Sequence, residues 1–196
     1  MRCGVCGAIF ACVCAALATF YGPTVQTLEL CAFASILLDL SLTDLDRFLI
    51  PNSGIMAAVA VRLTYLYLVL SRGVMDISAV GYYIGSTLAV GTVLLATVLV
   101  ADRLLGADSM GGGDLKLFAV AALYVGWQQS ILLVFLACLF GLAFAAARGL
   151  LPDSADGADE PSDPVTFPFG PSIALACVVT LLCGSSVQAW FAWWLG

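Results

Sequence analysis

Residues 111–127 read GGGDLKLFAVAALYVGW, with three glycines and an ionisable Asp114 directly before an apolar run. The stretch holds about 17 residues, so as a helix it would be roughly 25 Å long at 1.5 Å per residue. The hydrocarbon core of a bilayer is about 30 Å thick, which brings Asp114 to the membrane surface or just beneath it. A carboxylate at that depth usually faces a polar cavity between helices, so Asp114 is a candidate functional residue.

The composition of the chain decides the surroundings in which it folds. Of its 196 residues, 62% are apolar and only 10% are charged, and the mean hydropathy is +1.07. Soluble domains do not have this composition. The apolar residues fall in long runs, several of which reach the ~20 residues that a helix needs to cross a bilayer. We therefore predict an all-α, polytopic integral membrane helical bundle, surrounded by lipid, that forms a single domain over residues 1–196.

Seven membrane spans are predicted from these runs and from the polar turns between them. They cover residues 4–21, 25–43, 54–71, 78–101, 111–127, 130–149 and 170–194. Arg2 precedes the first run, and residues 16–18 are Ala-Leu-Ala, a pattern that also fits a signal peptide. If that segment is cleaved, six spans remain.

An acidic segment at about residues 150–168 separates the last two spans. It is rich in Asp, Ser, Pro and Gly and lacks the apolar side chains needed for packing, so we expect a mobile aqueous connector in the cytoplasm. Five of the thirteen acidic residues lie in this segment: Asp153, Asp156, Asp159, Glu160 and Asp163. The net charge of −6 therefore reflects mainly one loop, and we expect no nucleic-acid partner.

The basic residues predict the orientation of the bundle. If the N-terminus is cytoplasmic, five of the seven basic residues fall on the cytoplasmic side, only Arg72 falls outside, and Arg62 lies within a span. The five are Arg2, Arg47, Arg103, Lys116 and Arg148. This asymmetry follows the positive-inside rule. It places two acid-bearing loops, residues 44–53 and 102–114, on the same cytoplasmic face.

The absence of histidine excludes several kinds of chemistry. Catalysis by Ser-His-Asp or Cys-His groups and histidine-ligated metals or haem all need an imidazole. Cys3 and Cys6 have the spacing of a zinc ligand pair, but a structural zinc site needs a second pair and the other cysteines are scattered. We expect no metal and no cofactor, which leaves carboxylate chemistry.

The second acid-bearing stretch, residues 42–54, reads LTDLDRFLIPNSG. Asp44 and Asp46 end one span, and Pro51-Asn52 turn the chain into the next. If Asp44 meets Asp114 in a partly desolvated site, the two cannot both ionise easily, so one keeps its proton while the other stays charged. Such a pair can activate water and protonate a peptide carbonyl, as in aspartic proteases. Gly111, Gly112 and Gly113 would let backbone and substrate come close.

Simpler interpretations exist for the same residues. Asp114 also suits the first turn of any helix, where the macrodipole favours an acid. Asp44 and Asp46 also suit an interface, as surface charges beside Arg47. From spacing alone these alternatives stay open.

Two segments resemble the signatures of the type IV prepilin peptidases, GxGD-type aspartyl proteases of the bacterial inner membrane. TDLDRFLIPN at residues 43–52 places Asp44 seven residues before Pro51, and GGGDLKL at residues 111–117 supplies the GxGD aspartate, Asp114. Two predicted spans separate the segments, as in that family. FPFGPSIAL at residues 167–175 is similar to the family's entry into its last helix. The resemblance implies that Asp44 and Asp114 are catalytic.

The resemblance also implies a substrate and a location. The substrates would be prepilins or pseudopilin precursors, cut at the cytoplasmic face of the inner membrane between a basic leader and a hydrophobic helix. The larger members carry a cytoplasmic loop with two CxxC pairs and methylate the new N-terminus, and no such loop lies between the first two predicted spans. The chain is similar to compact members, such as those serving Flp or tight-adherence pili, and we find no support for methylation.

The remaining charged residues receive supporting or structural roles. Asp46 either supports Asp44 or faces water, and the second is favoured. Lys116 follows Asp114 by two positions and so points to another face of the helix, where contact with lipid headgroups is favoured over catalysis. Glu29, Asp39 and Arg62 lie within predicted spans and are interpreted as polar contacts inside the bundle.

Two other functions fit the same acids. In a small proton- or cation-coupled transporter they would bind the ion, although internal repeats, which transporters often show, are not visible. A non-enzymatic assembly scaffold would not need them. A presenilin-like protease shares GxGD but places its partner aspartate in a Tyr-Asp pair, which this sequence lacks. The sequence carries no signal for an oligomeric state.

Overall fold

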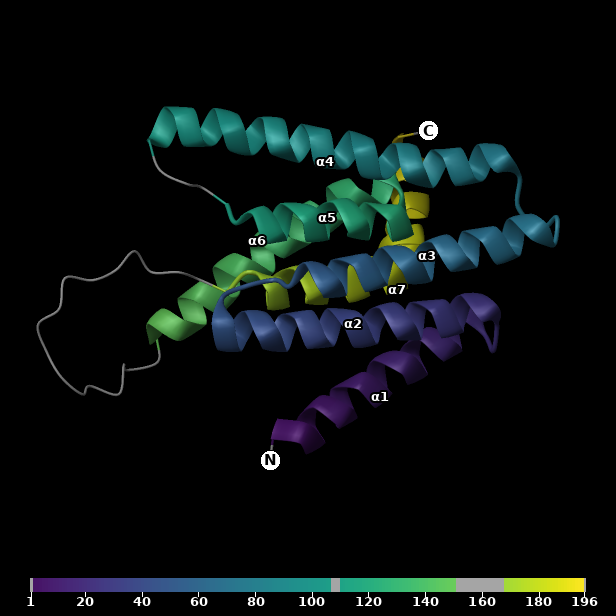
Figure 1. Ribbon diagram of the computed structural model, residues 1–196, viewed down its shortest axis with the longest axis horizontal. Coiled ribbons are helices and arrows are strands. Elements are labelled where there is room, and N and C mark those ends of the chain that lie inside the picture. The colour runs from purple at the N-terminus through teal and green to yellow at the C-terminus, as the bar shows by residue number, and fades with distance from the viewer. Residues whose placement is uncertain (1, 107–109, 151–167, 196) are drawn as a thin grey trace, which may run out of the picture.

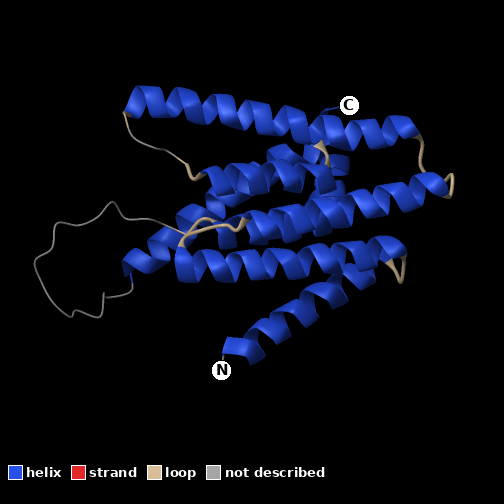
Figure 2. Ribbon diagram, viewed as in Figure 1, coloured by secondary structure: helices blue, strands red, loops and turns tan. Residues whose placement is uncertain are grey.

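The computed structural model describes residues 2–106, 110–150 and 168–195. All regular structure in these ranges is helical, as predicted (Figure 2). The helices are α1 (Arg2–Tyr21), α2 (Val25–Arg47), α3 (Asn52–Ser71), α4 (Ile77–Leu105), α5 (Gly112–Val125), α6 (Trp127–Leu150) and α7 (Gly170–Leu195). They correspond to the seven apolar runs. The predicted acidic connector falls almost entirely at residues 151–167, outside the described residues.

Within the residues that the structure describes, four helices are long and apolar enough to cross a membrane: α2, α3, α4 and α6. The helix α5 has only 14 residues, or roughly 21 Å at 1.5 Å per residue, and is shorter than the predicted run. Gly126, at φ 80°, ends α5, and α6 begins at the next residue. The number of helices that cross the bilayer stays a prediction.

The short helix α5 forms the centre of the bundle (Figure 1). It packs against α3, α4, α6 and α7, and nearly all of it after the first turn is buried. The helices α2 and α3 lie side by side, α4 runs along the far side of α5, and the N-terminal end of α1 diverges from α2. The ring of Phe33 on α2 stacks on that of Tyr124 on α5, with centroids 3.7 Å apart.

The helix termini that carry the predicted site residues gather at one end of the bundle, on the left in Figure 1. These are the C-terminal end of α2 and the N-terminal ends of α3, α5 and α7. The helix α2 runs to Arg47, about one turn beyond the predicted span, because polar residues end an apolar run without ending a helix. Phe48, in the left-handed conformation at φ 52°, closes α2, and Pro51 precedes α3.

The stack between Phe33 and Tyr124 gives a test of the core. Phe33→Ala is expected to destabilise the protein by about 3 kcal/mol, because the lost ring leaves a cavity beside α5. Thermal or denaturant unfolding of the purified protein in detergent would measure this change. The matched control Phe135→Ala removes a ring that is 64% exposed on α6 and should change stability by less than about 0.5 kcal/mol. Equal losses in the two variants would contradict the packing described.

Candidate active site

Asp44 lies on the last turn of α2, where its side chain meets the first residue of α7. The residue is 5% exposed, and its Oδ2 accepts a hydrogen bond of 2.8 Å from the backbone N–H of Gly170. A Cβ at residue 170 would lie 2.8 Å from Oδ2 and 3.0 Å from the Asp44 Cβ, so this approach requires glycine. Backbone N–H groups and the positive end of a helix dipole favour a charged carboxylate.

Asp114 lies in the first turn of α5, partly buried beside the same site. Burial, with a further contribution from the charge of Asp44, raises the pKa of Asp114 to about 6. One turn beyond Asp114, Phe118 packs near Phe169, with ring centroids 6.3 Å apart. The start of α7 thus contacts both α2 and α5, and the two predicted carboxylates come together at one end of the bundle.

The two carboxylates differ in their surroundings. Asp44 is 5% exposed, and this burial opposes its charge, while the hydrogen bond from the backbone N–H of Gly170 favours the charged form. Asp114 has its pKa raised by burial first and by Asp44 second, so near neutral pH it holds the proton more readily than an ordinary aspartate does. Two carboxylates placed in this way can act as a base and an acid.

The three glycines before Asp114 have different surroundings. A Cβ at Gly113 would lie 2.9 Å from the Cβ of Ile50, so glycine there lets α5 pack against the connection between α2 and α3. A Cβ at Gly111, which precedes the helix, would lie 3.3 Å from the Asp114 Oδ2. Gly112 is exposed, and a Cβ at that residue would have nothing within 4 Å. Of the three residues, Gly113 is therefore the one whose close packing most clearly requires glycine.

Lys116 and Asn52 join the two predicted signature segments. The Lys116 Nζ donates a 3.0 Å hydrogen bond to the Asn52 Oδ1, and both residues are exposed. Asn52 is the first residue of α3, directly after Pro51. The sequence did not predict this contact. Asp46 lies exposed on the last turn of α2.

Sequence reasoning missed the backbone N–H of Gly170 as a partner of Asp44. The segment Pro-Phe-Gly-Pro at residues 168–171 carried the available signal, since a glycine between an aromatic residue and a proline suggests a close backbone approach. Across the part of the chain that the structure describes, no group of three or more Cys, Asp or Glu side chains is placed to hold a metal ion.

Comparison with known proteins identifies relatives of this chain. The sequence profile of the type IV leader peptidase family matches residues 31–146, which include both Asp44 and Asp114. No solved structure gives a significant match.

Several curated relatives carry the name prepilin leader peptidase/N-methyltransferase. The protein from Aeromonas salmonicida strain A449 is 30% identical over 175 residues, which cover 86% of this chain and 54% of the relative. The Aeromonas hydrophila protein is 29% identical over 182 residues (90% and 56%), and the Bacillus subtilis strain 168 protein is 27% identical over 185 residues (93% and 66%). The chain thus spans between about half and two thirds of the length of these relatives. With several helices apolar enough to cross a bilayer, it is a multi-pass membrane protein, and it belongs to the type IV leader peptidase family.

Proposed function

We propose that this protein is an aspartyl endopeptidase that removes the leader peptide from type IV pilin-like precursors, with Asp44 and Asp114 as catalytic residues. The observation that carries the proposal is the meeting of these two carboxylates, from helices far apart in the sequence, at one end of the bundle. The family membership supports it, because the matched residues include both acids. The proposal is limited to peptide cleavage, which a carboxylate pair can perform.

The chemistry follows from the difference between the two acids. Charged Asp44 takes a proton from a water molecule, whose oxygen attacks the scissile carbonyl carbon, while Asp114 gives its proton to the carbonyl oxygen. The tetrahedral intermediate then collapses: the C–N bond breaks, Asp44 returns its proton to the departing amine, and Asp114 recovers a proton from the hydroxyl. Each acid ends in its starting state, so no other co-reactant is consumed.

An apolar groove beside the site suits a precursor with a hydrophobic helix. It has a volume of about 290 Å³ and lies between α1, α2 and α7. Its lining includes Leu45 and Pro171, the residues that follow Asp44 and Gly170 in the sequence. A hydrophobic helix in this groove would bring the peptide bonds at its end toward the two carboxylates.

The surroundings of the enzyme are part of the same proposal. The basic residues predict that this end of the bundle faces the cytoplasm of a bacterial inner membrane. The leader peptide would then be cut on the cytoplasmic side, before the precursor is assembled. Precursors of Flp or tight-adherence pili are the proposed substrates, by similarity to the compact members of the family.

Removal of either carboxyl group tests the catalytic pair. Asp44→Asn and Asp114→Asn are each expected to lower kcat for prepilin cleavage at least about a hundredfold, because each removes one side of the acid–base pair. The measurement is conversion of a purified prepilin by the purified variants in detergent or proteoliposomes. Asp39→Asn, an exposed change on the same helix as Asp44, is the matched control and should keep normal activity. Full activity in either site variant would end the proposed mechanism.

The pKa of Asp114 predicts the pH dependence. The value is raised to about 6, so the neutral acid is present below that pH and is lost as the pH rises through it. We expect kcat to fall on the alkaline side with an apparent pKa near 6 that belongs to the pair. Single-turnover cleavage from about pH 5 to pH 8 would measure this limb. A parallel unfolding series separates titration from denaturation, and a flat profile over the range would contradict the assignment of Asp114 as the acid.

The contact between Gly170 and Asp44 gives a third test. Gly170→Ala places a methyl group 2.8 Å from the Asp44 Oδ2, so the carboxylate or α7 must shift. We expect kcat to fall about tenfold to a hundredfold, because small displacements of a catalytic group have effects of this size. Gly81→Ala on α4, where nothing lies within 4 Å, is the matched control. If both variants cleaved prepilin at the normal rate, the contact would have no part in catalysis.

A further inference from the structure

The C-terminal end of α5 lies inside the bundle, where its carbonyl groups need partners. The last carbonyls of any helix have no partner within the helix. In an apolar environment an unpaired carbonyl costs several kcal/mol. Leu123, Tyr124 and Val125 are all buried, so this end of α5 depends on side chains from other helices.

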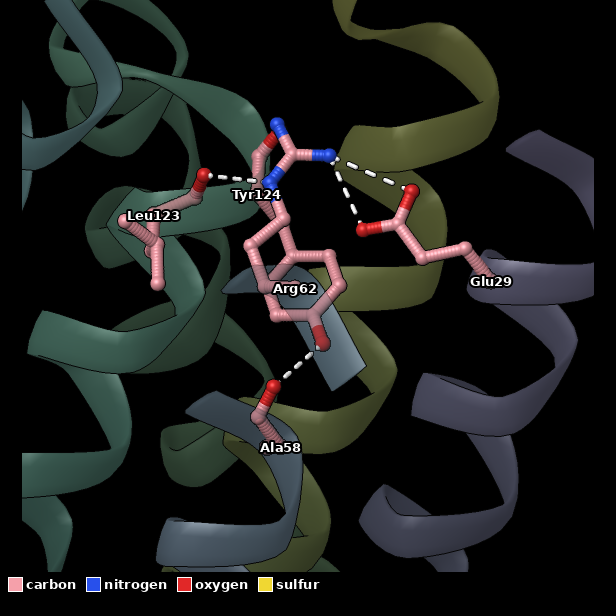
Figure 3. A network of polar contacts seen from close by, with 5 residues as sticks. All are labelled: Glu29, Ala58, Arg62, Leu123 and Tyr124. Carbon is pink, nitrogen blue, oxygen red and sulfur yellow. Dashed lines mark hydrogen bonds and ion pairs between the residues drawn. The ribbon is translucent and has the colours of Figure 1, made fainter. Parts of the chain in front are cut away.

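Arg62 on α3 supplies those partners (Figure 3). Its Nε donates a 2.9 Å hydrogen bond to the carbonyl oxygen of Leu123, and Nη2 donates one of 3.4 Å to that of Tyr124. Nη1 lies 2.9 Å and 3.2 Å from the two carboxylate oxygens of Glu29 on α2. The guanidinium group also lies over the Tyr83 ring, 4.5 Å from its centroid. Arg62 is 4% exposed and Glu29 6%.

Each part of this arrangement has a physical reason. A cation at a helix C-terminus interacts favourably with the helix dipole. The planar guanidinium presents several donors in fixed directions, which a lysine cannot do. A buried charge requires a counter-charge, and Glu29 provides it. The Tyr124 hydroxyl, which donates to the Ala58 carbonyl oxygen at 2.7 Å, ties the same turn of α5 to α3.

The helices that Arg62 connects are the ones that carry the two carboxylates. Glu29 and Asp44 both belong to α2, and the accepting carbonyls and Asp114 both belong to α5. The connection is made at the end of each helix that lies away from the site. Because a helix is stiff, fixing one end relative to a neighbour restricts where the other end can stand.

We propose that Arg62, with its charge balanced by Glu29, is a positioning residue that holds α5 at a fixed depth against α2 and so sets the place of Asp114 opposite Asp44. The catalytic consequence rests on the proposed function. The alternative is an ion pair that stabilises the fold and has no separate effect on catalysis.

Two single substitutions distinguish these roles. Arg62→Lys keeps the positive charge beside Glu29 but loses the fork that reaches both carbonyls, so kcat should fall about tenfold with KM unchanged. Glu29→Gln removes the counter-charge but keeps an oxygen acceptor for Arg62 and leaves the carbonyl contacts in place, so it should lower thermal stability while reducing kcat less than Arg62→Lys does. Arg72→Lys, at an exposed position after α3, is the matched control. Wild-type kcat in Arg62→Lys, or losses of activity that only follow the losses of stability, would overturn the proposal.

Two further measurements keep the test decisive. If Arg62→Lys does not fold, the double variant Glu29→Met/Arg62→Met removes both buried charges together and should fold with reduced kcat; normal kcat in it would refute the role. Amide hydrogen exchange of residues 112–125 tests positioning without any substrate. Faster exchange in Arg62→Lys than in Glu29→Gln supports the positioning role of Arg62, and equal exchange in the two variants overturns it. Failure of the wild type to cleave prepilin would instead reject the proposed function.

Discussion

A short helix inside a membrane bundle needs protein partners at any end that lies in the apolar interior, and the C-terminal end of α5 obeys this constraint. Its 14 residues cannot reach across the hydrocarbon core, so lipid or bulk water cannot serve both termini. At the C-terminal end of α5, Arg62 donates hydrogen bonds to two of the last carbonyls, and Glu29 balances the charge of Arg62. At the N-terminal end, Gly113 lets the first turn pack against Ile50. The position of Asp114 follows from these contacts.

The start of α7 completes the site by approaching Asp44. One backbone N–H and one missing side chain, both at Gly170, make that approach possible. The two carboxylates therefore have unlike surroundings: Asp44 accepts a hydrogen bond at a helix end, and Asp114 is set into the first turn of α5 with a raised pKa. Burial opposes the charge of both residues, and the backbone N–H of Gly170 favours the charge of Asp44.

The helices and the two candidate acids were predictable from the sequence, because apolar runs and the spacing of acids around glycine and proline are local signals. The extension of α2 past Thr43 was not, since a helix can continue through polar residues once it leaves the membrane. The bond from Gly170 to Asp44 was also not predictable, because 126 residues separate its partners and hydropathy carries no information about which helices touch.

The buried ion pair between Glu29 and Arg62 was also only partly predictable from local sequence patterns. Glu29, Asp39 and Arg62 were interpreted as polar contacts within the bundle; the structure confirms this for Glu29 and Arg62, whereas Asp39 is exposed, so that part of the prediction was wrong. Opposite charges in two neighbouring apolar runs suggest a pair. What no local pattern showed is that Arg62 also reaches the carbonyls of Leu123 and Tyr124, because this depends on where α5 ends in space.

The two ends of α5 are held with unequal strength. Buried and charged groups hold the C-terminal end of α5. Near its N-terminal end, the hydrogen bond from Lys116 to Asn52 is exposed to solvent and contributes about 1 kcal/mol or less. The exposed contact at the first turn of α5 is thus weaker than the buried contacts at its last turn, so local opening near Asp114 costs less free energy than opening of the core.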